Sequence, residues 1–211
     1  MMTSTEHPNQ TGNAAEIFGS LPTRDAETLR HLHARLERES QAAGILDVAY
    51  RTIDTPVGSV LLAATEAGLV RVAFERESHD RVLELLSERI SPRLLRSPGR
   101  LDAVARELDE YFAGRRTAFD LPLDWRLSKG FRREVLSKLP SIAYGTTASY
   151  GAMALAAGSP RAVRAVGTAC ATNPLPLVVP CHRVVRSDGS IGQYAGGPEA
   201  KKLLLALEHA A

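Results

Sequence analysis

Hydrophobic residues follow two different spacings in the first half of the chain. Over residues 24–43, Leu29, Leu32 and Leu36 recur at helical spacing among arginines and glutamates, which predicts an amphipathic helix. Residues 47–74 instead alternate between apolar and polar positions, and glycine-containing turn sequences break them into three runs. This pattern predicts an antiparallel meander.

The next stretch mixes helical and extended patterns. Apolar residues at helical spacing predict one helix at about 79–90 and a stronger one at 100–112, stopped by Gly114. Residues 119–123 alternate and predict an extra strand. Because this stretch carries no chemical motif, residues 47–125 are predicted to form a small α/β scaffolding domain.

Helical patterns dominate residues 126–211. One helix is expected to be capped by Ser149 and ended by Gly158, and the next to open with Ser159 as N-cap and Pro160 at the first helical position. Two short helices joined this closely match a helix-turn-helix. The predicted fold is an α/β N-terminal domain with a small antiparallel sheet, followed by a mainly α-helical C-terminal domain.

The second helix of this unit has two contrasting faces. At ~100° per residue, Val163, Val166 and Cys170 fall on one apolar side. The other side carries Arg161, Arg164, Ala165 and Thr168. A narrow face with arginines suits close approach to a DNA groove, although a solvated helix face would show the same pattern.

Composition limits the class of protein. The 211 residues are 44% hydrophobic and 24% charged, as in a soluble globular protein with one large or two small domains. A net charge of +2 permits nucleic-acid binding without favouring it. Residues 1–46 form an N-terminal extension, expected to be disordered over residues 1–20, whose helix could dock on the body or bind a partner.

Two cysteines, Cys170 and Cys181, are too few for a disulfide framework and lack the spacing of metal ligands. His31 and His33 are two positions apart on a helix and make a poor metal pair. No signal-peptide or membrane-spanning pattern occurs. We therefore expect a cytoplasmic protein without a metal site, in which a cysteine can remain a free thiol.

One stretch combines an apolar run with reactive side chains. Residues 175–179 run into a proline, predicting a strand or buried segment that delivers Cys181 to a pocket edge. A thiol attacks as thiolate, and His182 and Arg183 are the nearest groups that could lower its pKa. By itself, a Cys-His pair is more often a buried cysteine beside a surface histidine. Glu208 ends the last predicted helix, where the dipole disfavours a carboxylate, so it either has a cationic partner or catalytic task or lies on a frayed end.

The longer string is more specific. P-C-H-R-V-V-R, followed by Q-Y-A-G-G, resembles the active-site signature of the O6-alkylguanine-DNA alkyltransferases, also called methylated-DNA–protein-cysteine methyltransferases. The resemblance covers residues 48–209 and is close from Tyr144 onward. It implies DNA repair by single-use transfer of an alkyl group from O6-alkylguanine in double-stranded DNA, with O4-alkylthymine as a second candidate lesion. It also implies base flipping, no cofactor and a monomer, with cooperative assembly on DNA left open.

The same resemblance implies roles for individual residues. Cys181 is the acceptor, Glu208 fixes the imidazole of His182, and His182 takes the thiol proton through water. Tyr150 protonates the leaving guanine, and Asn173 orders the segment before an active-site strand. Arg164 is the finger that replaces the rotated nucleotide, and the helix-turn-helix supplies the other candidate DNA contacts, Arg161, Ala165, Thr168 and Ser159. The base pocket is assigned to Pro180, Val184, Tyr194, Ala195 and Gly196.

Three features depart from the family pattern. Leu136 stands where a tryptophan is usual, Ala195 replaces a frequent serine, and residues 1–46 have no counterpart.

Two rival functions make different predictions. A helix-turn-helix regulator with a redox-active or bystander cysteine would bind DNA reversibly, and a Cys-His hydrolase would turn over. The adjacent histidine counts against the hydrolase, and the presence of Cys181 counts against a damage-recognising relative that has lost its nucleophile.

Overall fold

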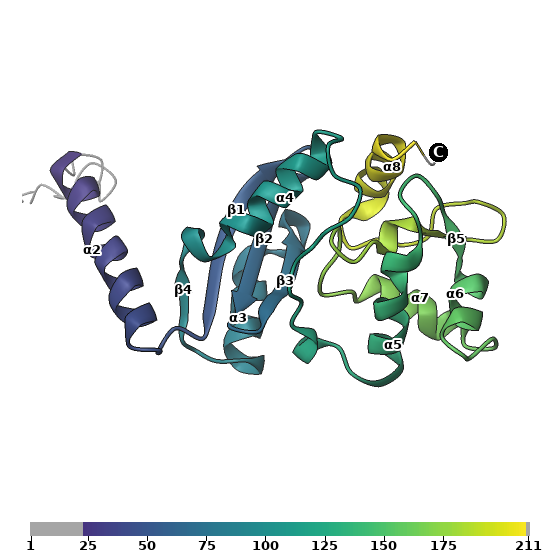
Figure 1. Ribbon diagram of the computed structural model, residues 1–211, viewed down its shortest axis with the longest axis horizontal. Helices are drawn as coiled ribbons and strands as arrows, with labels where there is room; N and C mark the ends of the chain where they lie inside the picture. Colours follow the sequence, from purple (N-terminus) through teal and green to yellow (C-terminus); the bar gives the residue numbers. More distant parts are fainter. Residues whose placement is uncertain (1–22, 210–211) are drawn as a thin grey trace, which may run out of the picture. The chain divides into compact units, whose positions relative to one another are not determined.

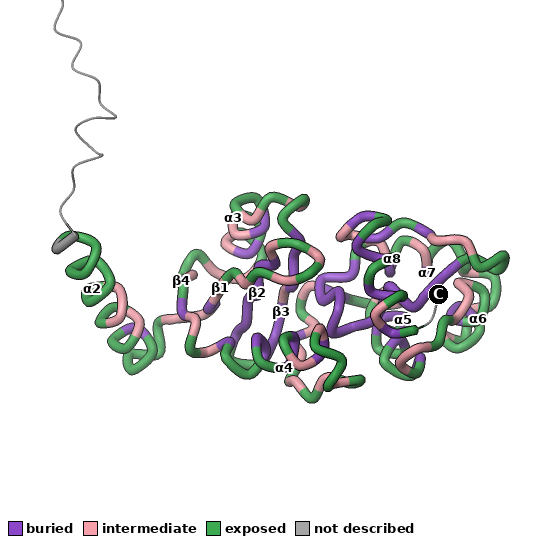
Figure 2. Tube along the Cα trace, turned by 90° about the horizontal axis from the view of Figure 1, so that it is seen from above, coloured by how far each residue is buried: buried purple, intermediate pink, exposed green. Residues whose placement is uncertain are grey.

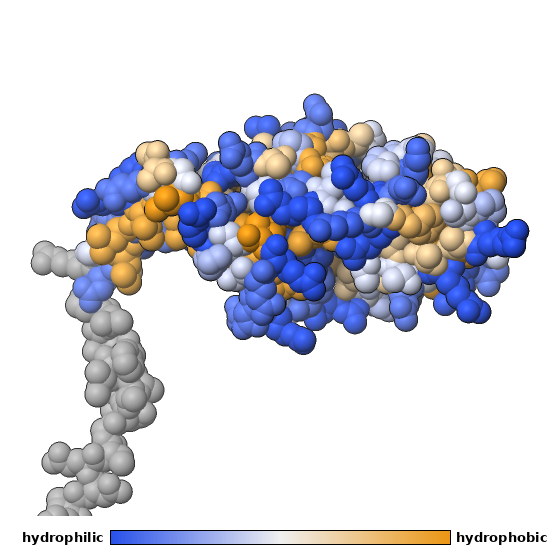
Figure 3. Space-filling model, turned by 90° about the horizontal axis from the view of Figure 1, so that it is seen from below, coloured by the Kyte–Doolittle hydropathy of each residue, from blue (hydrophilic) through white to orange (hydrophobic). Residues whose placement is uncertain are grey.

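The computed structural model describes residues 23–209, and the chain divides into two compact units, residues 1–43 and 44–211. The described part of the first unit is the helix α2 (Thr23–Ala42), which confirms the predicted amphipathic helix. Its three leucines, Leu29, Leu32 and Leu36, are 52–65% exposed, and Figure 3 shows hydrophobic side chains along this helix. The segment predicted to be disordered, residues 1–20, lies outside the described residues.

A four-stranded sheet begins the second unit (Figure 1). Its strands are β1 (Val48–Thr55), β2 (Gly58–Thr65), β3 (Gly68–Phe74) and β4 (Leu94–Arg96), in the order β3-β2-β1-β4. The first three pair antiparallel, which confirms the meander. The short β4 pairs parallel with β1 and makes the sheet mixed. Sequence alternation could not reveal a strand of three residues.

The extra strand predicted at residues 119–123 is not formed. This segment makes a single bridge from Leu123 to Leu69, and the carbonyl of Pro122 accepts a hydrogen bond from the Leu69 amide at 2.8 Å. Gly68 has φ +132°, and a Cβ there would collide with the Pro122 carbonyl. The close approach of the two backbones therefore depends on this glycine.

Two helices cover opposite faces of the sheet, α3 (His79–Arg89) and α4 (Asp102–Phe112). Successive residues of β2 point to opposite faces, so Val60 and Leu62 pack with α4 while Leu61 and Ala63 pack with α3. Figure 2 shows the two helices on either side of the strands. The core on the α4 side continues into the helical half of the unit, which joins both halves in one hydrophobic cluster.

The helical half contains four helices and a small parallel pair of strands. The helices are α5 (Gly130–Lys138), α6 (Tyr150–Ala156), α7 (Val163–Ala171) and α8 (Gly197–Leu207); the strands are β5 (Ala148–Ser149) and β6 (Val184–Val185). Short 3-10 turns are η1 (Glu75–Glu77), η2 (Pro98–Leu101), η3 (Trp125–Leu127), η4 (Leu139–Ser141) and η5 (Cys181–Arg183). The α/β-then-helical fold class is thereby confirmed. Within residues 23–209, no helix is both long and apolar enough to cross a membrane.

The helix-turn-helix is formed by α6 and α7. Ser149 caps α6 through a hydrogen bond from the amide of Ala152, as predicted, and Gly158 follows its end with φ +69°. The predicted start of α7 at Ser159 and Pro160 is wrong by several residues. The amide of Ala162 bonds to the Ser159 carbonyl at 2.8 Å and closes a separate turn, so Ser159 makes no side-chain cap.

The apolar run before the cysteine is buried but is not a strand. Leu175, Leu177 and Val179 are at most 1% exposed, and Leu177 has φ +72° in an irregular turn. Prolines at positions 174, 176 and 180 lack amide donors, which prevents a regular strand ladder. The prediction of a buried segment is confirmed, and that of a strand is wrong.

Candidate active site

Cys181 opens the 3-10 turn η5 and is 1% exposed. Its Sγ accepts a hydrogen bond from Asn173 Nδ2 at 3.2 Å. The same amide group donates to the Val179 carbonyl at 2.9 Å, and Asn173 Oδ1 accepts from the Leu175 amide at 3.0 Å. Asn173 therefore braces the irregular turn at both ends and also contacts the sulfur.

Burial raises the pKa of the Cys181 thiol to about 11, although the hydrogen bond from Asn173 and the charge of Lys201 act in the opposite direction. The largest effects that lower this pKa come from Asn173 and Lys201, whereas His182 and Arg183 were the candidates nearest in sequence. Within residues 23–209, neither side chain is hydrogen-bonded to the sulfur; His182 Nε2 and the Arg183 guanidinium bond to Glu208 instead. At pH 7 the thiolate lies about 5 kcal/mol above the thiol, so Cys181 is protonated at rest.

Glu208 stands at the C-terminal end of α8 and is 1% exposed. Arg183 donates to both of its carboxylate oxygens, from Nε to Oε2 at 2.8 Å and from Nη2 to Oε1 at 3.0 Å. Burial alone would raise the pKa of Glu208, but hydrogen bonds from His182 and Arg183 lower it to about 2. The cationic partner expected from its position is Arg183, and the alternative of a frayed end is wrong.

The ionised carboxylate fixes the tautomer of His182. Its Oε1 can only accept, so His182 Nε2, at 2.9 Å, must carry the proton it donates. Burial lowers the pKa of His182, against the opposite effect of Glu208, and keeps the imidazole neutral. Nδ1 is then an acceptor, and this buried atom has no hydrogen-bond partner among residues 23–209. The site thus holds a neutral base with an open proton-accepting position.

Sequence reasoning missed Tyr111, which comes from α4 in the α/β half. Its Oη donates to Glu208 Oε1 at 2.6 Å, and burial raises the pKa of the phenol far above its ordinary value. The half predicted to act only as scaffold therefore supplies a side chain to this network. Tyr111 lies on the apolar face of its helix, where spacing alone cannot separate a packed tyrosine from one that donates.

Lys201 was also missed. It is fully buried on α8, its Nζ donates to the Val184 carbonyl at 2.5 Å, and its charge lowers the pKa of Cys181. The sequence did carry a signal for it. Lys201, Leu204 and Glu208 are spaced for one helix face, so both charges stand on the stripe that faces the core.

The predicted proton donor Tyr150 is half-buried at the start of α6. Its hydroxyl lies against Gly192, so closely that a Cβ at that position would overlap it. Burial, with the negative charges that Cys170 and Cys181 would carry, raises the pKa of Tyr150. The phenol therefore keeps the proton that a leaving guanine would need.

The predicted base-pocket residues lie on both sides of the 3-10 turn and in the loop before α8. Tyr194 is 7% exposed, with its ring centroid 6.3 Å from that of His182 and 5.4 Å from that of Phe74. Pro180 and Val184 are buried, whereas Ala195 and Gly196 are half-buried. Ala195 brings no hydroxyl to this wall, and Leu136, the other departure from the family pattern, is fully buried in the core.

The helix face predicted to meet DNA is open. Arg161, Arg164, Ala165 and Thr168 are exposed, and Ser159 is half-exposed. Val166 and Cys170 are buried as expected, and burial raises the pKa of Cys170. Val163 does not follow them, because the first residue of α7 lies beyond the edge of the core and is 40% exposed. No group of three or more potential metal-binding side chains occurs in the part of the chain the structure describes.

Comparison with known proteins places this geometry in a family. Residues 130–210 match the DNA binding domain of 6-O-methylguanine DNA methyltransferase, and residues 48–125 match its ribonuclease-like domain. A methylated-DNA–protein-cysteine methyltransferase of Mycolicibacterium paratuberculosis is 39% identical over 161 residues, covering 76% of this chain and 92% of the relative. The constitutive enzyme of Bacillus subtilis is 36% identical over 163 residues, covering 75% and 94%.

Solved structures agree with the sequence relatives. The Mycobacterium tuberculosis O6-methylguanine methyltransferase is 37% identical, with a TM-score of 0.68 over 77% of this chain and 93% of that one. A structure of the M. tuberculosis protein in complex with DNA gives the same values. The chain belongs to the methylated-DNA–protein-cysteine methyltransferase family, whose members repair DNA by alkyl transfer.

Proposed function

We propose that this protein repairs O6-alkylguanine in duplex DNA by transferring the alkyl group once to Cys181. The observation that carries the assignment is the neutral, buried His182. Its Nε2 proton is committed to Glu208, and its Nδ1 is an unpartnered acceptor within residues 23–209. Cys181 is thus adjacent in sequence to a histidine whose Nδ1 is available to accept the thiol proton.

The reaction follows from these groups. The Cys181 proton passes through water to His182 Nδ1, and Glu208 stabilises the imidazolium that forms. The sulfur then forms a bond to the alkyl carbon as the bond from that carbon to O6 breaks. The electron pair goes to the guanine, which takes a proton from Tyr150 and leaves as a neutral base. His182 returns a proton through solvent to the tyrosinate.

The product explains why each chain acts once. Cys181 becomes a thioether with no leaving group, and no cofactor enters the sequence of steps. Asn173 and the buried turn hold the sulfur so that the attacking atom, alkyl carbon and O6 can lie in line. A lesion such as O4-alkylthymine offers the same alkyl–oxygen bond, and the Tyr194–Gly196 wall would select between the two bases.

The DNA contacts belong to the exposed face of α7. Arg161 and Arg164 make no ion pair within residues 23–209, which leaves both guanidinium groups available to a duplex. Arg164 would fill the space of the rotated nucleotide, while Ala165, Thr168 and Ser159 let the backbone approach the groove. We further infer a monomer in the reducing cytoplasm, because one chain carries the whole relay and both cysteines are free.

A stoichiometric assay tests this proposal. The protein is incubated with excess duplex containing O6-methylguanine, and restored guanine is counted per chain. We expect one guanine per chain and then no further reaction, none with Cys181→Ser, and an unchanged count with the buried control Cys170→Ala. Continued turnover would favour a hydrolase, and reversible DNA binding without restored guanine would favour the regulator with a bystander cysteine.

A further inference from the structure

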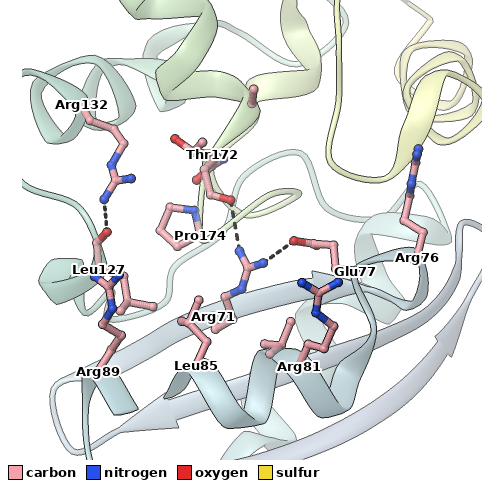
Figure 4. Close-up of a pocket in the computed structure, with 13 residues that line it drawn as sticks. Arg71, Arg76, Glu77, Arg81, Leu85, Arg89, Leu127, Arg132, Thr172 and Pro174 are labelled. Atoms are coloured by element: carbon pink, nitrogen blue, oxygen red, sulfur yellow. Dashed lines mark hydrogen bonds and ion pairs between the residues drawn. The ribbon is translucent and has the colours of Figure 1, made fainter. Parts of the chain in front are cut away.

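A cavity of about 620 Å³ lies at the junction of the α/β and helical halves, and Cys181 is not among its lining residues. Figure 4 shows it between β3 and α3 on one side and the end of α7 and the start of α5 on the other. Its basic lining residues are Arg71, Arg76, Arg81, Arg89 and Arg132. Glu77 is its one acidic lining residue, and Val82, Leu85, Leu127 and Pro174 supply apolar surface.

Little of this positive charge is neutralised by the protein. Glu77 pairs with Arg71, and Arg132 donates to the Leu127 carbonyl. Arg81 and Arg89 are exposed on α3, and their side chains form no ion pair or hydrogen bond with any residue of 23–209. Figure 4 shows Arg76 extending toward α8, where it lies against Gly197. Several guanidinium groups therefore share one concave surface with a single carboxylate.

We propose that this cavity binds phosphate groups. The guanidinium fork matches the oxygens of a phosphate and can bind it with two parallel hydrogen bonds. Like charges gathered in a hollow focus a positive potential, which an anion relieves. The phosphates can come from a DNA strand that continues past the α7 face or from a free phosphorylated molecule.

The cavity also borders the residue that holds the nucleophile. Arg71 Nη1 donates to the Asn173 carbonyl at 3.4 Å, while the Asn173 side chain reaches the Cys181 sulfur. A substitution of Arg71 would therefore change both the charge of the cavity and the position of Asn173 beside the sulfur. Arg81 and Arg89 line the cavity without touching this brace, and they are the positions to change.

The test compares the full-length protein with the double variant Arg81→Gln/Arg89→Gln and with Arg106→Gln. Arg106 is an exposed arginine of α4, on the opposite face of the sheet, and controls for loss of charge alone. Two probes are used: an undamaged duplex, whose dissociation constant is measured across salt concentrations, and inorganic tripolyphosphate, measured by calorimetry. Thermal melting checks that all three proteins are folded.

If DNA supplies the phosphates, the double variant lowers the slope of log Kd against log salt by about 2, since each lost contact contributes ~0.9. If a free molecule supplies them, tripolyphosphate binds the unchanged protein saturably and at least tenfold more weakly to the double variant. In either case Arg106→Gln leaves the slope and the tripolyphosphate affinity near those of the unchanged protein. A double variant indistinguishable from Arg106→Gln with both probes would overturn the proposal. Transfer from free O6-benzylguanine is measured alongside. Its absence in the unchanged protein would count against the proposed function but would not bear on phosphate binding by the cavity.

Discussion

Replacing His182 by alanine should change the pH dependence of alkyl transfer. In the unchanged protein the reactive form is the thiol beside a neutral imidazole, and proton transfer between them leaves the total charge the same. The rate should therefore be flat from just above the pKa of His182, which burial lowers, up to that of Cys181, which burial raises to about 11. Without the imidazole, only the free thiolate can react, and its fraction rises tenfold per pH unit.

The size of the effect follows from the burial of the sulfur. At pH 7 a thiol of pKa about 11 is ionised in roughly one molecule in 10⁴, equivalent to about 5 kcal/mol. His182→Ala should thus lose up to ~10⁴-fold in rate at pH 7, and its rate should rise about 100-fold between pH 7 and pH 9.

Free O6-benzylguanine in single-turnover experiments is the substrate for this test, because it separates the chemical step from DNA binding. The ionisation of the thiol would be followed in both proteins by the absorbance of the thiolate at 240 nm. An unchanged protein whose rate already rises tenfold per pH unit between pH 7 and 9 would refute the relay, and so would a variant with a flat profile.

Three further changes separate the roles of neighbouring residues. Arg164→Ala should weaken repair of duplex DNA far more than reaction with free O6-benzylguanine, since the proposed role of its exposed side chain is to contact DNA alone; equal losses on both substrates would contradict the finger role. Glu208→Gln should slow transfer with DNA affinity nearly intact and should also alter acid stability. Because the pKa of Glu208 is held at about 2 instead of 4.5, it stabilises the fold above pH 4.5, and this contribution of about 3 kcal/mol is lost as pH falls toward 2. Urea unfolding between pH 5 and 2 measures it, and an identical pH dependence in the variant would rule it out. Tyr111→Phe removes a hydrogen bond to that carboxylate and should lower the free energy of unfolding by about 1.5–3 kcal/mol; a loss within error of zero would show that the phenol only packs.

The sequence was most informative where one periodicity continues over several turns. The meander, α3, α4 and α6 follow from spacing and caps, because burial on one face imposes those patterns directly. It failed where the backbone is irregular. Prolines around Leu175–Val179 turn an apolar run into a buried turn, and the true start of α7 depends on a main-chain hydrogen bond that no residue type encodes.

The chemistry divides in a similar way. The motif around Cys181 and the position of Glu208 indicated two segments far apart in the sequence, and the structure brings His182 and Glu208 together. The residues that set the protonation states of Cys181 and Glu208 could not be found among their neighbours in the sequence. Tyr111 and Lys201 reach the site through tertiary packing, and burial, which decides the state of the thiol, is a property of the whole fold.

Peptide mapping after reaction tests the central claim most directly. The protein is incubated with a duplex containing O6-methylguanine, its intact mass is recorded, and the digested peptides are sequenced by mass spectrometry. The account predicts that one methyl group replaces one hydrogen per chain, located on Cys181, with Cys170 unmodified. An unchanged mass in the presence of excess lesion, or a methyl group on any other residue, would contradict it.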